Sequence, residues 1–224
     1  MSTTPQLFDD VHGMWAGLDA PIQRTIEVED VEHRQRRYTI GRMKTITESR
    51  VTMSKVMEPT DANFLGKVFG GSILSLLDLV AYATASRFAG NICVTASFDR
   101  VDFHSPIEVG ELVICEGLVS YVGRTSVEVT IEVYAENVFA GDRRHTNTAR
   151  VTMVAIKDGK PVEVPRLVCE TQDDKVRFLQ GKLRREIRGV QRAEYDSLAT
   201  IISNLDEARL ESLMGSTALV EELR

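Results

Sequence analysis

The stretch SILSLLDLVAYATASRF, residues 72–88, decides the fold class of this chain. It holds no proline and no glycine but many leucines and alanines, which predicts a helix about 25 Å long at 1.5 Å per residue. Because the segment is apolar on nearly every side, we expect the helix to be buried. A single carboxylate, Asp78, stands in the middle of it, and a glycine pair, Gly70 and Gly71, comes just before it.

Alternating patterns elsewhere in the chain predict strands. In TSVEVTIEV, residues 125–133, apolar residues alternate with polar ones such as Glu128 and Thr130, which is typical of a half-buried strand. Three further stretches are also interpreted as strands: residues 49–58, 111–121 and 147–156.

A fifth strand is predicted at ICVTASF, residues 92–98. Here Ile92 and Val94 fall in the apolar phase, and Cys93 falls in the polar phase as a small filler. The phase changes near residues 99–100, which predicts a bulge or bend.

Short connections with glycine join the last four of these strands, at Gly110, Gly123 and Gly141, and predict an antiparallel meander. A buried helix beside an antiparallel sheet of about five strands is an α+β architecture, and a sheet that wraps the helix is a hotdog fold. We expect an N-terminal extension at 1–48, this hotdog domain at 49–168 and a helical C-terminal extension at 169–224.

Composition excludes several functional classes. The chain has 224 residues and a net charge of −6, which argues against nucleic acid as the main partner. No apolar run is long enough for a membrane span, and the N-terminus lacks the pattern of a secretory signal. Three cysteines at wide spacing and four scattered histidines predict neither disulfides nor a metal site, so we expect a cytoplasmic protein without a cofactor.

Three stretches resemble the hotdog-fold acyl-CoA thioesterases, in particular the group of the brain-type acyl-CoA hydrolase and its short bacterial relatives. They are PTDANFLGKVFGGSILSLLDLVA at 59–81, ICVTASFDRVDFHSPIEVGELV at 92–113 and VGRTSVEVTIEV at 122–133. The resemblance covers about residues 51–182. It implies an acyl-CoA substrate and a homodimer, further assembled as a trimer of dimers (a hexamer). It also implies that Asn63 and Asp78 are the catalytic pair, with the asparagine of one subunit working beside the acid of the other.

Thioester hydrolysis needs an activated water or a nucleophile, together with donors for the oxyanion that forms on the carbonyl. Free N–H groups at Gly70 and Gly71, at the positive end of the helix dipole, suit the second role. Asp78 lies on the same face as Gly71, two turns along, where its poorly solvated carboxylate would act as general base or attack directly. The plainer interpretations remain open: Asp78 as a structural anchor, Asn63 as a turn cap, and the glycine pair as a tight turn.

The resemblance also identifies the turn VGRTS as a nucleotide-contacting loop. There Gly123, Arg124, Thr125 and Ser126 would hold coenzyme A phosphates, although a solvated hairpin turn is the alternative. Arg143, Arg144 and Arg166 are weaker candidates for the 3′-phosphate. Lys67, at a position where the family more often has Asn or Asp, is a weaker candidate for contact with a phosphate. We expect His104 to be a hydrogen-bonded structural histidine.

The C-terminal part predicts an amphipathic helix. Thr171 and Asp174 form a capping-box pattern at its start, and seven basic residues stand between 175 and 192 against one acid. Its apolar stripe consists of Val176, Leu179, Leu183, Ile187 and Val190. We expect the helix to pack against a partner or another subunit; a solvated helix and a nucleic-acid or membrane surface are the alternatives.

Two functional classes follow from these patterns. The first is an acyl-CoA thioesterase that hydrolyses an acyl-CoA to a free carboxylic acid and coenzyme A at composite sites in a hotdog dimer. The alternative is a non-hydrolytic acyl-CoA-binding or sensing module that acts through its tails.

Overall fold

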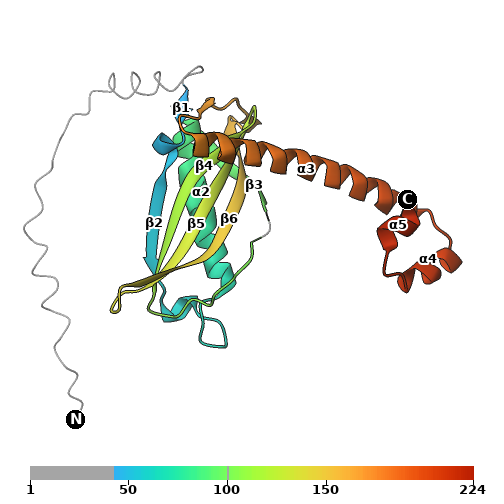
Figure 1. Cartoon of the computed structure of the whole chain (residues 1–224), viewed down its shortest axis with the longest axis horizontal. Helices are drawn as coiled ribbons and strands as arrows, with labels where there is room; N and C mark the ends of the chain where they lie inside the picture. Colours follow the sequence, from blue (N-terminus) through green and yellow to red (C-terminus); the bar gives the residue numbers. More distant parts are fainter. Residues whose placement is uncertain (1–42, 100) are drawn as a thin grey trace, which may run out of the picture. The chain divides into compact units, whose positions relative to one another are not determined.

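The structure is a computed structural model that describes residues 43–99 and 101–224, so most of the expected N-terminal extension lies outside the described residues (Figure 1). Its main sheet is antiparallel, with the strand order β2-β4-β5-β6-β3 and the short β7 beside β6. The strands are β2 (Val51–Val56), β3 (Ile92–Phe98), β4 (Leu112–Val122), β5 (Ser126–Asn137), β6 (Asp142–Lys157) and β7 (Lys160–Pro161). A separate parallel pair joins β1 (Lys44–Thr45) to β8 (Leu167–Val168), and two 3₁₀ turns are η1 (Thr47–Ser49) and η2 (Pro59–Asp61).

The expected helix is confirmed as α2 (Gly70–Ala89). It ends where Gly90 adopts a left-handed conformation, with φ at 69°, and donates its N–H to the carbonyl of Ser86 at 2.8 Å. The sheet curls around α2 (Figure 1), so the α+β architecture and the hotdog arrangement are both confirmed.

The core lies between α2 and the concave face of the sheet. From the helix, Leu77, Val80 and Ala85 are fully buried, and they belong to the same apolar cluster as Val129 and Ile131 of β5. The alternation of β5 therefore directs its apolar residues at the helix, as the sequence predicts.

The expectation that α2 is buried on every side is wrong for the single chain. Leu74, Leu79 and Tyr82 are exposed to 37%, 55% and 44%. The sheet covers only one side of the helix, and the outward apolar face has no cover within the described residues.

The predicted four-strand meander is only partly right. Strands β4, β5 and β6 follow one another, but β3 pairs with β6 and not with β4. The segment after β3 therefore leads from one edge of the sheet to β4, past the two intervening strands β6 and β5, and its length of more than ten residues allows this crossing.

The predicted phase of β3 is also wrong. Cys93 is buried, with 1% exposure, whereas Ile92 and Val94 are exposed to 61% and 43%. Burial raises the pKa of the Cys93 thiol to about 11. The predicted irregularity exists, but the register shift lies between Thr95 and Ser97, earlier than expected. Both faces of this edge strand carry apolar residues. The alternation therefore defines two faces of β3 but does not show which face packs against the helix.

The C-terminal extension consists of α3 (Gln172–Ser203), α4 (Glu207–Met214) and α5 (Leu219–Leu223). The capping box at its start is confirmed, because the N–H of Asp174 donates to Thr171 Oγ1 and the N–H of Thr171 donates to Asp174 Oδ2, both at 3.1 Å. No helix of the described ranges 43–99 and 101–224 is both long enough and apolar enough to cross a membrane.

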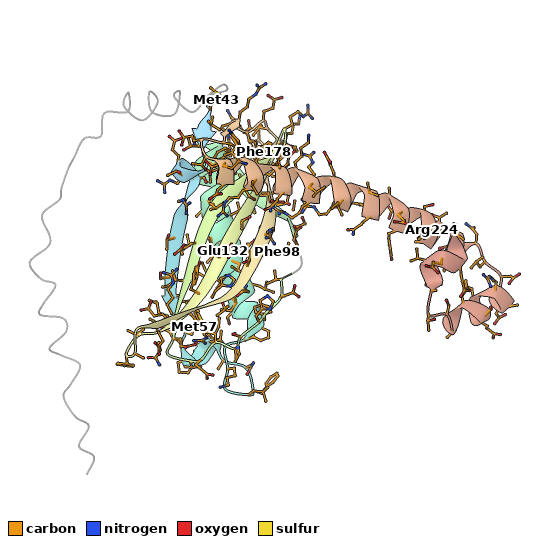
Figure 2. All side chains as sticks on the ribbon, in the orientation of Figure 1. Met43, Met57, Phe98, Glu132, Phe178 and Arg224 are labelled. Atoms are coloured by element: carbon orange, nitrogen blue, oxygen red, sulfur yellow. The ribbon has the colours of Figure 1, made fainter. Side chains whose placement is uncertain are left out.

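Helix α3 covers part of the outer face of the sheet, opposite to α2. Phe178, labelled in Figure 2, packs against Tyr121 of β4 with the two rings tilted and their centroids 5.1 Å apart. The predicted polar face of β5 is consequently covered by α3 at Glu128, which is 2% exposed, and Thr130 on the same face is also buried. The apolar stripe of α3 faces away from the sheet, with its residues exposed to between 42% and 67%, so packing against a partner remains a prediction.

Candidate active site at the start of helix α2

A buried carboxylate organises the chain just before α2. Asp61 accepts a hydrogen bond from Lys55 Nζ at 2.7 Å and one from the backbone N–H of Glu58 at 3.0 Å. The bond from Lys55 is the main reason that the pKa of Asp61 is lowered. The carbonyl of Asp61 in turn accepts the N–H of Phe69 at 2.7 Å, which fixes the entry into the helix.

Asn63 caps its own loop in the single chain. Its Oδ1 accepts the backbone N–H groups of Leu65 at 2.9 Å and Lys67 at 3.2 Å. The tip of the loop projects two apolar side chains into solvent, since Phe64 is fully exposed and Leu65 is 83% exposed. The rigid loop thus presents an apolar tip beside Asn63.

The glycine pair leaves backbone donors available at the start of α2. No acceptor among the described residues receives the N–H groups of Gly70 and Gly71, which are the first two of the helix. The ring of Phe69 lies where a Cβ of residue 71 would stand, so only glycine fits there without displacing the ring. These donors and the helix dipole can stabilise an oxyanion.

Asp78 is partly exposed and accepts a hydrogen bond from Thr95 Oγ1 of β3 at 2.5 Å. Sequence reasoning missed Thr95. The correct phase of β3 would have found it, because side chains two residues apart in a strand point to the same face and Cys93 faces the helix. The threonine hydroxyl holds the carboxylate in one orientation.

One chain does not bring these groups to a single point. Gly71 and Asp78 are seven residues apart in α2, which corresponds to about 10 Å along the axis. A donor and a base that serve one carbonyl must each lie within about 3 Å of the reacting atoms. No hydrogen bond within the described residues joins Asn63 to Asp78 either.

An open cavity of about 410 Å³ adjoins Gly71 on the outward side of α2. It is lined by Lys55, Asp61, Phe69, Gly71, Ser72, Ser75, Leu76 and Leu79.

The predicted coenzyme A residues lie at the turn between β4 and β5. This turn stands at one end of β5, and the hairpin at 137–142 stands at the other end. Gly123 donates its N–H to the carbonyl of Ser126 at 2.8 Å, and Arg124 is exposed. The predicted turn is confirmed as a backbone feature, while its role in binding remains a prediction.

Three of the weaker phosphate candidates are already neutralised by carboxylates. Arg143 pairs with Glu116 at 2.6 Å, and Arg144 binds both carboxylate oxygens of Glu111 at 2.5 and 2.7 Å. Lys67 pairs with Glu108. Of the weaker arginine candidates, Arg166 remains exposed.

The expectation that His104 is a hydrogen-bonded structural histidine is wrong. Its side chain is exposed and forms no hydrogen bond with a described residue. Over the described ranges, no group of three or more His, Cys, Asp or Glu side chains could hold a metal ion.

Sequence comparison matches residues 65–138 to the family model described as "Thioesterase superfamily". The acyl-CoA thioester hydrolase YkhA of Bacillus subtilis, which is described as uncharacterized, is 39% identical over 128 residues, covering 57% of this chain and 74% of that protein. The cytosolic acyl coenzyme A thioester hydrolase of Rattus norvegicus is 34% identical over 143 residues, covering 62% of this chain and 38% of that protein.

Solved structures agree with this match. A hexameric acyl-CoA thioesterase, solved in its apo form, superposes with a TM-score of 0.65 at 36% identity, covering 68% of this chain and 99% of that chain. The acyl-CoA hydrolase of Staphylococcus aureus, in complex with butyryl coenzyme A, coenzyme A and coenzyme A disulfide, superposes with a TM-score of 0.65 at 32% identity, covering 73% and 100%.

The Staphylococcus aureus hydrolase has also been solved with single alanine replacements of an asparagine, an aspartate and a threonine. In that protein the asparagine precedes the aspartate by 15 residues and the threonine follows it by 17. Asn63, Asp78 and Thr95 have the same spacing in this chain.

Proposed function

This chain belongs to the hotdog-fold acyl-CoA thioesterases, the acyl-CoA thioester hydrolases of the cytosolic and bacterial hexameric group, and we propose that it cleaves acyl-CoA at sites shared by two subunits. The products are a free carboxylic acid and coenzyme A. The observation that carries the proposal is the hydrogen bond between Thr95 and Asp78 on the face of α2 that the chain leaves uncovered.

In the proposed reaction, the N–H groups at Gly70 and Gly71 bind the thioester carbonyl oxygen and stabilise its developing negative charge. Asp78 accepts a proton from a water molecule while the water oxygen bonds to the carbonyl carbon. The carbon–sulfur bond then breaks, and the coenzyme A thiolate takes up the proton from Asp78, which returns to its carboxylate form. Thr95 orients the carboxylate, and no cofactor or metal takes part.

The separation along α2 supports a site that needs a second subunit. A donor at Gly71 and a base at Asp78 are about 10 Å apart in one chain, too far to act on one carbonyl. If two α2 helices lie antiparallel across a dimer axis, Asp78 of one subunit meets the glycine pair and Asn63 of the other. The same arrangement would repeat on the other side of the axis.

The exposed apolar side chains support the same dimer. Leu79 and Tyr82 on α2 and Val94 on the neighbouring edge strand are all more than 40% exposed, and β3 has no strand partner on its outer edge among the described residues. Apolar surface next to a free strand edge favours association. The fully exposed Phe64 would enter the second subunit. We propose a homodimer that assembles further into a hexamer, as in the hexameric relative.

We propose further that the turn at Gly123, Arg124, Thr125 and Ser126 binds coenzyme A phosphates, and that the chain divides at residues 48 and 168. A cytoplasmic location is proposed because the similar rat protein is described as cytosolic.

A thiol-release assay over a panel of acyl-CoA chain lengths tests the activity. Asp78→Asn should lower kcat by about 100-fold or more, because a general base contributes about that much. The exposed Glu211, replaced by Gln, is the matched control and should retain activity. Coenzyme A binding without thiol release from any acyl-CoA would support the alternative of a non-hydrolytic module.

Mixing two inactive variants tests the shared site. In a dimer of Asn63→Ala and Asp78→Ala subunits, one site carries both changes and the other carries neither. Random mixing should restore about a quarter of the wild-type activity, since half of the dimers are mixed and half of their sites are intact. Absence of recovery in mixed dimers, verified by two affinity tags, would place each site within one chain.

A further inference from the structure

The inner face of α3 is held on the sheet by charged contacts. Arg184 donates to the buried Glu128 at 2.6 Å, and Arg188 contacts both carboxylate oxygens of Asp99 at 2.7 Å. Between Phe178 and these arginines, Gly181 is buried, and a Cβ there would lie 2.5 Å from Cβ of Tyr121. The helix therefore has one close-packed position over β4 and β5 (Figure 2).

This position brings Arg185 to the turn between β4 and β5. A Cβ on Gly123 would overlap the guanidinium of Arg185 and would lie 2.6 Å from Ser126 Oγ. The guanidinium and the hydroxyl thus converge over Gly123, in the space that a side chain at that position would fill.

The turn itself is rigid. Besides the bond from Gly123 to Ser126, the carbonyl of Thr125 accepts the N–H of Ala155, and the carbonyl of Arg124 accepts an N–H from the segment after β7, both at 3.0 Å. Its side chains therefore project from a fixed backbone.

The charges at this turn are not neutralised by any residue that the structure describes. Arg184 and Arg188 each have a carboxylate partner, but neither Arg185 nor Arg124 has an ion pair with any described residue, and both are exposed. Two guanidinium groups and a hydroxyl at one rigid turn suit a phosphate, because guanidinium binds phosphate oxygens in a bidentate manner.

We propose that Arg185 is a substrate-binding residue, and that α3 together with the β4–β5 turn forms the site for the phosphate groups of coenzyme A. The C-terminal extension then contributes a residue to the substrate site. This inference rests on the proposed function, because it takes coenzyme A thioesters as the ligands.

The test measures binding of coenzyme A, dephospho-coenzyme A and pantetheine by calorimetry. Arg185→Gln should weaken coenzyme A binding by about 10-fold or more and leave pantetheine binding as it is, because pantetheine has no phosphate. Arg192→Gln removes the same charge two turns further along α3 and should change affinity less than twofold. An equal loss for dephospho-coenzyme A assigns Arg185 to the diphosphate, and a smaller loss assigns it to the 3′-phosphate.

Gly123→Ala provides a second variant that keeps every charge. Its methyl group would displace the guanidinium of Arg185, so coenzyme A affinity should fall as well. In kinetics, the ratio of kcat/KM for acyl-CoA to kcat/KM for the acyl-pantetheine thioester should fall about 10-fold in Arg185→Gln. Melting temperatures check that both variants are folded.

Wild-type affinity for coenzyme A in a folded Arg185→Gln variant would overturn the inference. This outcome differs from a failure of the proposed function, in which no acyl-CoA is hydrolysed by the wild-type protein. In that case the binding measurements would still decide the role of Arg185.

Discussion

Replacing Arg184 with methionine should destabilise the protein, because the buried carboxylate of Glu128 would remain without its main ion-pair partner. Arg184 is the main partner of Glu128, whose side chain is 2% exposed. Methionine keeps the aliphatic length but leaves Glu128 with the hydroxyl of Ser120 at 2.8 Å and with Arg188 at 3.7 Å. Arg188 already binds Asp99, so the negative charge of Glu128 loses most of the favourable interactions that offset its burial.

The expected cost follows from this burial. Removing one partner of a buried ion pair costs about 3–5 kcal/mol, because the remaining charge stays desolvated. The contacts that remain to Glu128 favour the lower end, about 3 kcal/mol. For a chain of this length, that free energy corresponds to a fall in Tm of about 6–12 °C.

Thermal unfolding at fixed protein concentration measures the effect. The matched control is Arg192→Met on the same helix, whose side chain is 86% exposed and 4.0 Å from Asp196. Such a surface pair contributes about 0–1 kcal/mol, so Tm should fall by only a few degrees. Adding Glu128→Gln to Arg184→Met removes the buried charge and should recover at least about half of the loss.

Two results would refute the reasoning. A fall in Tm no larger than that of Arg192→Met would mean that Glu128 is solvated, and hence that α3 does not cover it. A double variant as unstable as Arg184→Met alone would show that the buried charge is not the cause.

Two further predictions concern Thr95 and Glu111. Thr95→Val removes the hydrogen-bond donor to Asp78 and should lower kcat by about 10-fold, whereas Thr95→Ser keeps the hydroxyl and most of the activity. Equal kcat values for the wild type and both variants in steady-state kinetics would contradict the proposed role of Thr95. Arg144 lowers the pKa of Glu111 below its ordinary value of 4.5, so the stabilisation is present above pH 4.5 and is lost as the pH falls through the lowered pKa. Glu111→Gln should therefore destabilise the protein at pH 7 by about 1–3 kcal/mol, and the difference from wild type should shrink below pH 4.5 in urea titrations; a constant difference would be inconsistent with this ion pair.

The sequence predicts the features that depend on neighbouring residues. The composition of residues 72–88 is sufficient for the helix, because helix propensity and the absence of glycine and proline are local properties. The alternation of 125–133 is sufficient for a strand in the same way. Asn63, Asp78 and the glycine pair were found because they lie close together in one characteristic stretch.

Thr95 shows what local patterns leave open. Alternation in residues 92–98 defines two faces, and the side that meets α2 depends on which edge of the sheet β3 joins. The crossing from β3 to β4 is not encoded in this alternation, so residues 92–98 alone predict the wrong face for Cys93 and do not indicate Thr95 as a partner of Asp78. The partner of Asp78 therefore emerged only from the folded chain.

The sequence by itself determined the positions of the central helix and of the strands, the family, and the acid and asparagine of the candidate site, because these follow from local propensity and from a continuous motif. Only the tertiary structure decided which arginine of α3 meets Glu128, which one reaches Gly123, and which residue holds Asp78. Those contacts join residues 17 to 62 positions apart, and their geometry depends on how α3 and β3 pack on the sheet. Side-chain contacts over such separations are a property of packing, which no local pattern encodes.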